Sequence, residues 1–354
     1  MKTSQKVLVS VVVIVVCLLL VAGGIAIYIG HLFMPQVKAV QSITTLSDGV
    51  YTITYRGDYG FDGFLEAGGA ATDSAMAVYM ERFLTHGMIP ESATAAEKEE
   101  PHGCSTIVRQ TAEGVMMGRN YDFDHHGRTM ITLTYPDNGY ASIATNSMEF
   151  LGLPADWQPS GNPMADMIAI AAIYVPMDGM NEKGLCVADL IDLDGEQVAQ
   201  DNGKPDITTV AGIRLLLDKA ATVEEAIALL QQYDMHSSIG FAHHYALCDT
   251  TGRAVVIEYV GGKMVVNESA LCTNFNLCQA AAGREFDLSC PGIPSAVERM
   301  EKMRRMDEAT SIVEGLKTVS FADWTQWSIL FDTRAKVANY YFHARFDTVF
   351  PISL

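Results

Sequence analysis

The order of strand and helix patterns is the feature that most limits the fold of this chain. From residue 104 to about 190, short apolar and β-branched segments alternate with turn residues, which predicts strands. Two consecutive helical patterns follow at 206–219 and 223–233, with capping residues Thr208 and Thr222. Strand patterns return at 240–276 and 328–342, on either side of a charged helical pattern at 295–307. This order favours an α+β fold in which antiparallel sheets are layered with helices.

Charge and composition exclude some functions. The 354 residues are 49% hydrophobic and 19% charged, with a formal net charge of −18. A chain of this kind is globular, and it lacks the basic excess that binding to nucleic acid needs. We therefore expect no nucleic-acid partner.

The N-terminus predicts a membrane anchor. Lys2 and Lys6 precede an uncharged stretch at 7–30, and a helix of about 20 apolar residues spans a bilayer core. The lysines favour a cytoplasmic tail at 1–6, a single-pass signal anchor at 7–30 and an extracytoplasmic position for the rest of the chain. A secreted protein that has lost a cleaved signal peptide is the alternative.

Residues 31–103 form a linker and an N-terminal segment. Alternation at 50–55 predicts a strand, and the glycine-rich stretch at 57–69 predicts a compact loop. A helix is expected at 71–84, with Met76 and Met80 at helical spacing. The stretch at 91–103, rich in Ala, Glu and Pro, predicts an exposed and cleavable loop that ends directly at Cys104.

Cys104 is the candidate nucleophile. It opens an apolar run, and a hairpin turn at Glu113-Gly114 would return the chain so that Arg119 and Asp122 lie near the thiol. If the chain is cut before Cys104, the residue gains its own α-amine, whose pKa near 7.7–8 suits a base for a thiol near 8.5. The plain alternative is a small buried side chain in a strand.

No pattern predicts a metal or a cofactor. The seven cysteines are scattered without zinc spacing, and the pairs His125-His126 and His243-His244 lack matching carboxylates in sequence. Asp189, Asp192 and Asp194 could touch a cation, although a solvated loop is the simpler interpretation. We therefore expect a domain without metal or cofactor.

Four motifs in consistent order resemble a known family. They are Gly103-Cys104-Ser105-Thr106 with Gly118-Arg119-Asn120-Tyr121-Asp122, the string 178–185 (DGMNEKGL), the segment 271–274 (LCTN), and 325–328 (TQWS) leading to 339–342 (NYYF). Together they resemble the choloylglycine hydrolase and penicillin V acylase family of linear amide C–N hydrolases, within the N-terminal nucleophile (Ntn) hydrolases. The resemblance covers about 104–354 and implies a four-layer αββα sandwich of antiparallel sheets. The stretch before Cys104, including 55–61 (YRGDYGF), is more like acid ceramidase-type relatives, in which an N-terminal subunit stays attached after autoproteolysis.

The resemblance also implies roles for the residues at these motifs. Cys104 would be the nucleophile, freed by autocatalytic cleavage at Gly103-Cys104, and its amine would be the base. Asp122 would orient the ammonium, and Arg119 would lower the thiol pKa.

Three further residues would complete the implied site. Asn274 would donate a side-chain N–H to the oxyanion, and Arg299 would match the family's second active-site arginine. Bile salt hydrolases often carry another asparagine where this chain has Ile191, so a backbone N–H at Ile191 would have to serve instead. This departure leaves the identity of the amide substrate open.

The sequence thus predicts a membrane-anchored enzyme that cleaves small N-acyl amides, in a domain at 104–354 that could form homo-oligomers. Two alternatives remain. An acyltransferase of the same fold would pass the acyl group to an amine, and a non-catalytic surface protein would keep an unprocessed chain.

Overall fold

Two β-sheets dominate the structure, a computed structural model that describes residues 23, 24, 28, 30–88, 103–123 and 127–354. The nine-stranded sheet has the order β1-β2-β5-β6-β7-β8-β11-β12-β13, and the six-stranded sheet has the order β14-β3-β4-β15-β16-β17. The strands of the nine-stranded sheet, in that order, are Thr44–Ser47, Val50–Arg56, Thr129–Tyr135, Ser142–Ser147, Asp178–Asn181, Cys186–Asp192, Ala242–Cys248, Ala254–Val260 and Lys263–Glu268. Those of the six-stranded sheet are Leu271–Cys272, Gly103–Gln110, Val115–Asp122, Thr325–Asp332, Val337–Phe342 and Phe350–Ser353.

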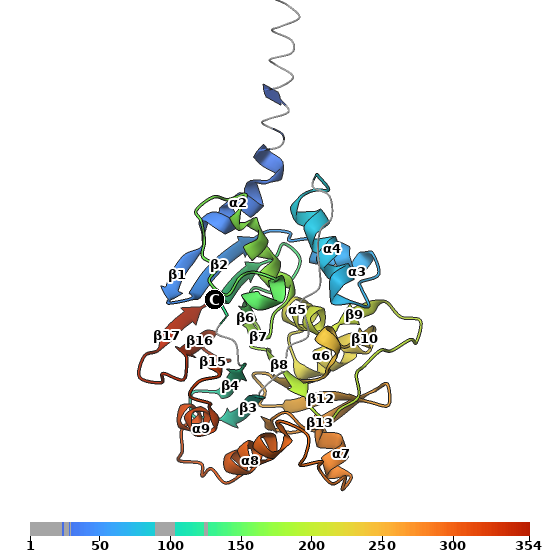
Figure 1. Ribbon diagram of the computed structural model, residues 1–354, viewed down its shortest axis with the longest axis vertical. Coiled ribbons are helices and arrows are strands. Elements are labelled where there is room, and N and C mark those ends of the chain that lie inside the picture. Colours follow the sequence, from blue (N-terminus) through green and yellow to red (C-terminus); the bar gives the residue numbers. More distant parts are fainter. Residues whose placement is uncertain (1–22, 25–27, 29, 89–102, 124–126) are drawn as a thin grey trace, which may run out of the picture.

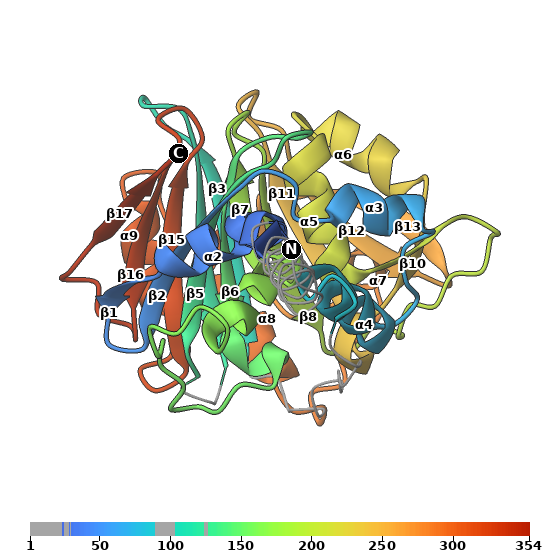
Figure 2. The same ribbon diagram turned by 90° about the horizontal axis from the view of Figure 1, so that it is seen from above.

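Helices cover the outer face of each sheet, so the molecule has four layers (Figures 1 and 2). The α-helices are α2 (Met34–Gln41), α3 (Phe61–Glu66), α4 (Asp73–Leu84), α5 (Thr209–Lys219), α6 (Val223–Leu230), α7 (Leu277–Ala281), α8 (Ile293–Arg304) and α9 (Ile312–Val319). The 3₁₀ segments within the described residues are η1 (Met148–Leu151), η2 (Asp166–Tyr174) and η3 (Ser238–Gly240). Helices α2 and α5 and the segment η2 contact the nine-stranded sheet, while α8 and α9 contact the six-stranded sheet. The α+β fold expected from the sequence is confirmed.

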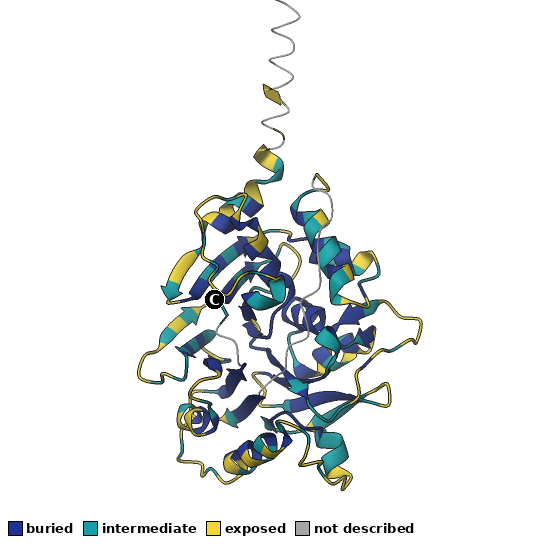
Figure 3. Cartoon of the chain, viewed as in Figure 1, coloured by how far each residue is buried: buried dark blue, intermediate teal, exposed yellow. Residues whose placement is uncertain are grey.

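Strand β4 shows how the layers are built. All of its residues are buried, because β3 and β15 flank it and both of its faces are covered. Met117 belongs to the large core that includes the space between the sheets, whereas Met116 packs in a second core with α8 and α9. The alternation of side chains along a strand puts these neighbours on opposite faces. Figure 3 shows the resulting dark band of buried residues through the middle of the molecule.

The segment before residue 104 is part of the same sheet. Strand β2 pairs with β5 along its whole length, in register Val50↔Thr129 to Arg56↔Tyr135. This pairing is parallel, which departs from the expected all-antiparallel sheets. The helix expected at 71–84 is present as α4, capped by Thr72, whose hydroxyl accepts a hydrogen bond from the Ala75 N–H at 3.2 Å.

Two local expectations were wrong. The segment 57–69 contains helix α3, because Phe61 and Phe64 lie one turn apart and both are buried. Gly60 starts that helix with φ 83°, where a β-carbon would also meet the Phe83 ring at 2.4 Å. The helix expected at 206–219 begins only at Thr209, because β9 (Asp206–Thr208) pairs in parallel with β10 (Asp234–His236).

Some predictions fall outside the described residues. These are the anchor at 7–30, apart from residues 23, 24, 28 and 30, and the loop at 91–103, apart from Gly103. In the part of the chain that the structure describes, no helix has the length and apolar character needed to cross a membrane.

Candidate active site

Cys104 lies near the start of β3, beside the central strand β4. It is opposite Tyr121, and Gly103 is opposite Asp122. The Cys104 side chain is 7% exposed, belongs to the large core and lines a cavity of about 720 Å³. Gly103 fits tightly, since a β-carbon there would lie 2.9 Å from Arg299 Nη2. The bond expected to be cut is therefore inside a strand, at the edge of a cavity.

Arg119 is fully buried behind the thiol. Its Nε pairs with Asp178 Oδ2 at 3.4 Å, and its Nη2 donates to the Asp189 carbonyl at 2.6 Å. Burial raises the pKa of the Cys104 thiol, while the Arg119 guanidinium lowers it. Arg119 thus lies where the sequence predicted it. Its ion-pair partner is Asp178, which lies in the quoted DGMNEKGL string but was not itself predicted as a site residue.

Asp122 is a buried carboxylate whose two oxygens differ in their hydrogen bonding. Oδ1 accepts a hydrogen bond from Thr325 Oγ1 at 2.5 Å, whereas Oδ2 is buried and has no hydrogen-bond partner among the residues that the structure describes. Burial raises the pKa of Asp122 from 3.8 to about 6, against the lowering influence of Arg299, Thr325 and Arg119. An unsatisfied carboxylate oxygen opposite Gly103 is a ready acceptor for a new cation at the start of residue 104.

Asn274 and Arg299 hold the backbone of Cys104 from the other side. The Cys104 N–H donates to Asn274 Oδ1 at 2.6 Å, and Arg299 Nη2 donates to the same oxygen at 2.9 Å. Arg299 Nη1 donates to the Cys104 carbonyl. Although Arg299 lies on the charged helix α8, it is only 3% exposed, so it is not a solvated helix charge.

The side-chain amide of Asn274 is oriented by these contacts. Because Oδ1 faces two donors, Nδ2 is turned to the Ile191 carbonyl, to which it donates at 2.8 Å. Nδ2 has a second N–H beyond this bond. Ile191 therefore contributes its carbonyl to the site, and the role foreseen for its N–H stays a prediction.

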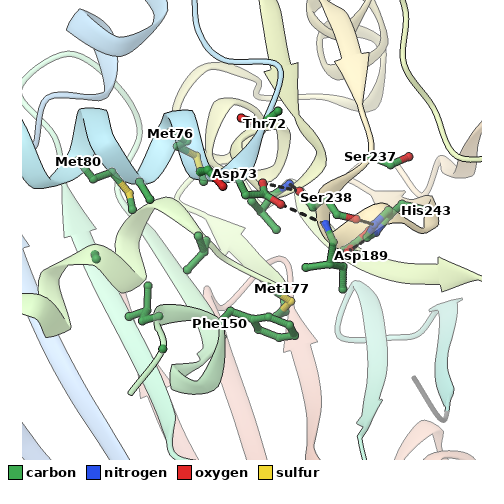
Figure 4. A pocket seen from close by; sticks show the side chains of 18 of the residues that line it. Thr72, Asp73, Met76, Met80, Phe150, Met177, Asp189, Ser237, Ser238 and His243 are labelled. Carbon is green, nitrogen blue, oxygen red and sulfur yellow. Dashed lines mark hydrogen bonds and ion pairs between the residues drawn. The ribbon is translucent and has the colours of Figure 1, made fainter. Parts of the chain in front are cut away.

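The cavity beside Cys104 has an apolar and a polar side (Figure 4). Met76 and Met80 of α4 line the apolar side together with Phe150 and Met177. Asp189, Ser238 and His243 line the polar side, with Asp73 at the start of α4. One wall of the cavity thus comes from the segment that precedes the expected cleavage point.

The polar side contains His243, which the sequence pattern raised only as a candidate metal ligand. His243 Nδ1 lies 2.9 Å from Asp189 Oδ2, and Nε2 lies 3.0 Å from the Ser238 carbonyl. Burial lowers the pKa of His243, but the Asp189 carboxylate outweighs it and raises the pKa overall. Asp189 and His243 lie on the neighbouring strands β8 and β11, and that pairing had no signal in the sequence.

The adjacent His244 belongs to a different cluster. Asp192, His244 and Glu258 place ligand-type atoms within 4.8 Å of one another. Glu258 accepts the backbone N–H groups of Leu277 and Cys278 at 2.6 and 2.8 Å, and the carboxylates raise the pKa of His244. His244 Nδ1 lies 2.9 Å from Glu258 Oε1 and Nε2 lies 3.9 Å from Asp192 Oδ1, so this group fits a buried ion-pair cluster that fixes the chain after Asn274. His125 and His126 lie outside the described residues.

Parts of the chain match known proteins. Residues 104–276 match the linear amide C–N hydrolases of the choloylglycine hydrolase family. Penicillin V acylase from Pectobacterium atrosepticum is 33% identical over 102 residues, which span 26% of this chain and 27% of that protein. The chain thus matches only about a quarter of the length of this curated relative.

Solved structures share the fold. Two crystal structures of variants of conjugated bile acid hydrolase from Clostridium perfringens cover 71% of this chain and 92% of theirs, with TM-scores of 0.50 and 0.51 and identities of 16% and 17%. Both the motifs around Cys104 and the layered sheets agree with the family match. Residues 104–276 thus resemble the linear amide C–N hydrolases of the choloylglycine hydrolase family, and the fold of the chain resembles that of the bile acid hydrolase structures.

Proposed function

We propose that this protein hydrolyses linear amides with Cys104 as an N-terminal nucleophile, after autocatalytic cleavage at Gly103-Cys104. The observation that carries the proposal is the position of Cys104, at the edge of a cavity with its backbone bound by Asn274 and Arg299. The family match that begins at Cys104 supports it.

Cleavage would proceed by an acyl shift. The thiolate adds to the Gly103 carbonyl, the C–N bond breaks, and the acyl group moves to sulfur as a thioester while the nitrogen becomes the α-amine of Cys104. Water then hydrolyses the thioester, which leaves a carboxylate on Gly103 and a free thiol. The new ammonium would lie near Asp122, whose Oδ2 is without a hydrogen-bond partner in the described part of the uncleaved chain.

Turnover would use the same groups. The α-amine takes the thiol proton, the thiolate attacks the substrate carbonyl, and the ammonium returns its proton to the departing amine. The second N–H of Asn274 Nδ2 would stabilise the oxyanion, an interaction typically worth about 10²–10³ in kcat. Water finally releases the acid and restores the thiol.

The cavity favours substrates with an apolar acyl chain. Met76, Met80 and Leu84 lie at i, i+4 and i+8 on one face of α4 and line the cavity with Phe150 and Met167. Because these walls are apolar, longer acyl chains would bury more surface, at about 25 cal/mol per Å².

A chain-length series tests this substrate class. Anilides with short, medium and long acyl groups should give rising kcat/KM, and Met80→Gln should lower kcat/KM for the long chain while sparing the short one. Met34→Gln, on an exposed methionine of α2, is the matched control. Equal kcat/KM across chain lengths would reject the apolar acyl site.

The two alternative functions predict different experimental results. An acyltransferase would transfer the acyl group to an added amine, so the transfer product should dominate over the free acid when the amine is present. A non-catalytic surface protein would keep the Gly103-Cys104 bond and resist labelling by acyl probes directed at thiols. We infer hydrolysis because the family match is to hydrolases.

For localisation, we propose that 7–30 anchors the protein in the membrane with the catalytic domain outside the cytoplasm, on the strength of its uncharged sequence. Alkaline carbonate washing of membranes tests it. The full-length protein should stay in the pellet, whereas release of the whole chain would reject the anchor, and a mature N-terminus beyond residue 30 would indicate a cleaved signal peptide.

A further inference from the structure

Five residues connect the N-terminal segment to the arginine behind the nucleophile. Asp73 of α4 accepts hydrogen bonds from Ser238 Oγ at 2.9 Å and from the Ile239 N–H at 3.1 Å. The Ser238 carbonyl lies 3.0 Å from His243 Nε2, and His243 Nδ1 lies 2.9 Å from the Asp189 carboxylate. Figure 4 shows these side chains meeting at the polar side of the cavity.

The two partners of His243 are both acceptors. A carboxylate and a carbonyl have no proton to give, so both ring nitrogens must donate and the ring is an imidazolium. His243 and Asp189 are each 6% exposed, and a buried charge pair of this kind holds its geometry because misalignment leaves a charge unpaired. The pair therefore fixes where Asp189 lies.

Asp189 in turn meets Arg119. Its carbonyl accepts from Arg119 Nη2 at 2.6 Å, and the other side of the guanidinium is held by Asp178. Burial raises the pKa of the Cys104 thiol overall, and the Arg119 guanidinium opposes that rise. A shift of Asp189 would change how Arg119 faces the sulfur.

The turn at Ser238–Gly240 is strained and is held by contacts with neighbouring residues. Ile239 has φ 45°, which is strained for a β-branched side chain and persists only where surrounding contacts fix it. The Asp73 carboxylate accepts from the N–H of this residue and from the hydroxyl of Ser238 before it, and Thr209 Oγ1 accepts from the Ser238 N–H at 3.0 Å. The start of α4 thus holds the carbonyl that His243 uses.

We propose that Asp189 and His243 are positioning residues for Arg119, and that Asp73 of the N-terminal segment holds them in place across the cavity. The N-terminal segment then supports the nucleophile as well as lining the cavity. This inference rests on the proposed function for its kinetic readout, but not for its measurement of the thiol.

The test uses the full-length chain with four variants. His243→Phe removes both donors, His243→Gln supplies an amide that can donate to both acceptors, and Asp73→Ala frees the turn from the N-terminal side. Thr222→Ala is the matched control, because it removes the helix cap of α6, a bond at 3.2 Å to the Glu225 N–H, away from the cavity. Two readouts are the kinetic constants and the pH profile of Cys104 alkylation by iodoacetamide, with Cys104→Ala as the blank.

In His243→Phe, kcat should fall about 10- to 100-fold with KM changed by less than about threefold, and the alkylation profile should move to higher pH because Arg119 no longer faces the thiol. Asp73→Ala should change kcat and the alkylation profile in the same direction but by less. His243→Gln should recover most of the wild-type kcat and most of the wild-type alkylation profile. Thr222→Ala should change neither kcat nor the alkylation profile.

A thiol profile unchanged in His243→Phe and Asp73→Ala would overturn the proposal, as would equal effects in Thr222→Ala. If His243→Phe does not fold, Asp73→Ala and His243→Gln decide the question. If the wild-type protein neither cleaves itself nor hydrolyses amides, the proposed function fails, while the thiol profile still tests the positioning of Arg119.

Discussion

The backbone N–H of Cys104 donates a hydrogen bond to Asn274 Oδ1 at 2.6 Å. In the intact chain this nitrogen is a peptide amide, which cannot act as a base. Cleavage would turn the same atom into an amine without moving it far from Asn274, Arg299 or Asp122. The residues that bind the peptide before cleavage are therefore the ones that would surround the catalytic base afterwards.

Asn274→Asp separates the two ends of the Asn274 side chain. The variant keeps an oxygen for the Cys104 nitrogen and Arg299 but loses the Nδ2 donor. We expect kcat for amide hydrolysis to fall about 10²- to 10³-fold, the usual loss for one oxyanion donor. Steady-state kinetics on purified protein measure this, and a kcat within threefold of wild type would remove Asn274 from the oxyanion site.

Asp122→Asn changes stability in a pH-dependent way in the uncleaved Cys104→Ala background. The folded-state pKa of Asp122 is raised from 3.8 to about 6, so the folded chain binds more protons between these values and loses stability as pH rises through them. The side-chain amide of Asp122→Asn does not ionise, so the variant does not lose this stability as the pH rises. Asp122→Asn should therefore be more stable than its parent by about 2–3 kcal/mol at pH 8, and equally stable near pH 4.

Urea unfolding of the two proteins at both pH values measures this difference. An equal free energy of unfolding at pH 8 would contradict the account of Asp122 as a carboxylate awaiting a cation. In the cleaved wild-type background the same substitution should lower activity instead, because the α-ammonium would then lose its partner.

Tyr59→Phe should loosen the N-terminal segment after cleavage. The Tyr59 hydroxyl donates to Asp218 Oδ2 at 2.5 Å, and Asp218 pairs with the buried Arg214 at 2.6 Å. Leaving this buried carboxylate short of a donor costs about 1–3 kcal/mol. The two fragments should separate at lower urea on size-exclusion chromatography.

Tyr55→Phe is the matched control, because the Tyr55 hydroxyl makes a longer bond, 3.2 Å, to the Asp58 carbonyl. It should dissociate at nearly the wild-type urea concentration. Equal behaviour of the two variants would show that the Tyr59–Asp218 contact does not hold the segment.

Local signals predicted much of this molecule. Alternation and turn residues predicted β2, β3, β4 and β12, and the cap at Thr72 with methionines at helical spacing predicted α4. The family motifs placed Cys104, Arg119 and Asn274, and the structure brings them together. These motifs are short and occur in a consistent order, so they can be recognised from the sequence alone.

Contacts that depend on strand register were missed. Arg119 meets Asp178 and not Asp122 as its ion-pair partner, because the two sheets face each other with those residues across the gap. Asp189 meets His243 because β8 and β11 pair in a register that no local pattern sets. The helix α3 was also missed, since its two phenylalanines are stabilised by burial and not by helix propensity.

Intact mass together with N-terminal sequencing of the purified protein tests the central claim most directly. The account predicts a fragment that begins at Cys104 in the wild-type protein, and only the uncleaved chain in Cys104→Ala. A single intact 38.5 kDa chain that hydrolyses amides would contradict it.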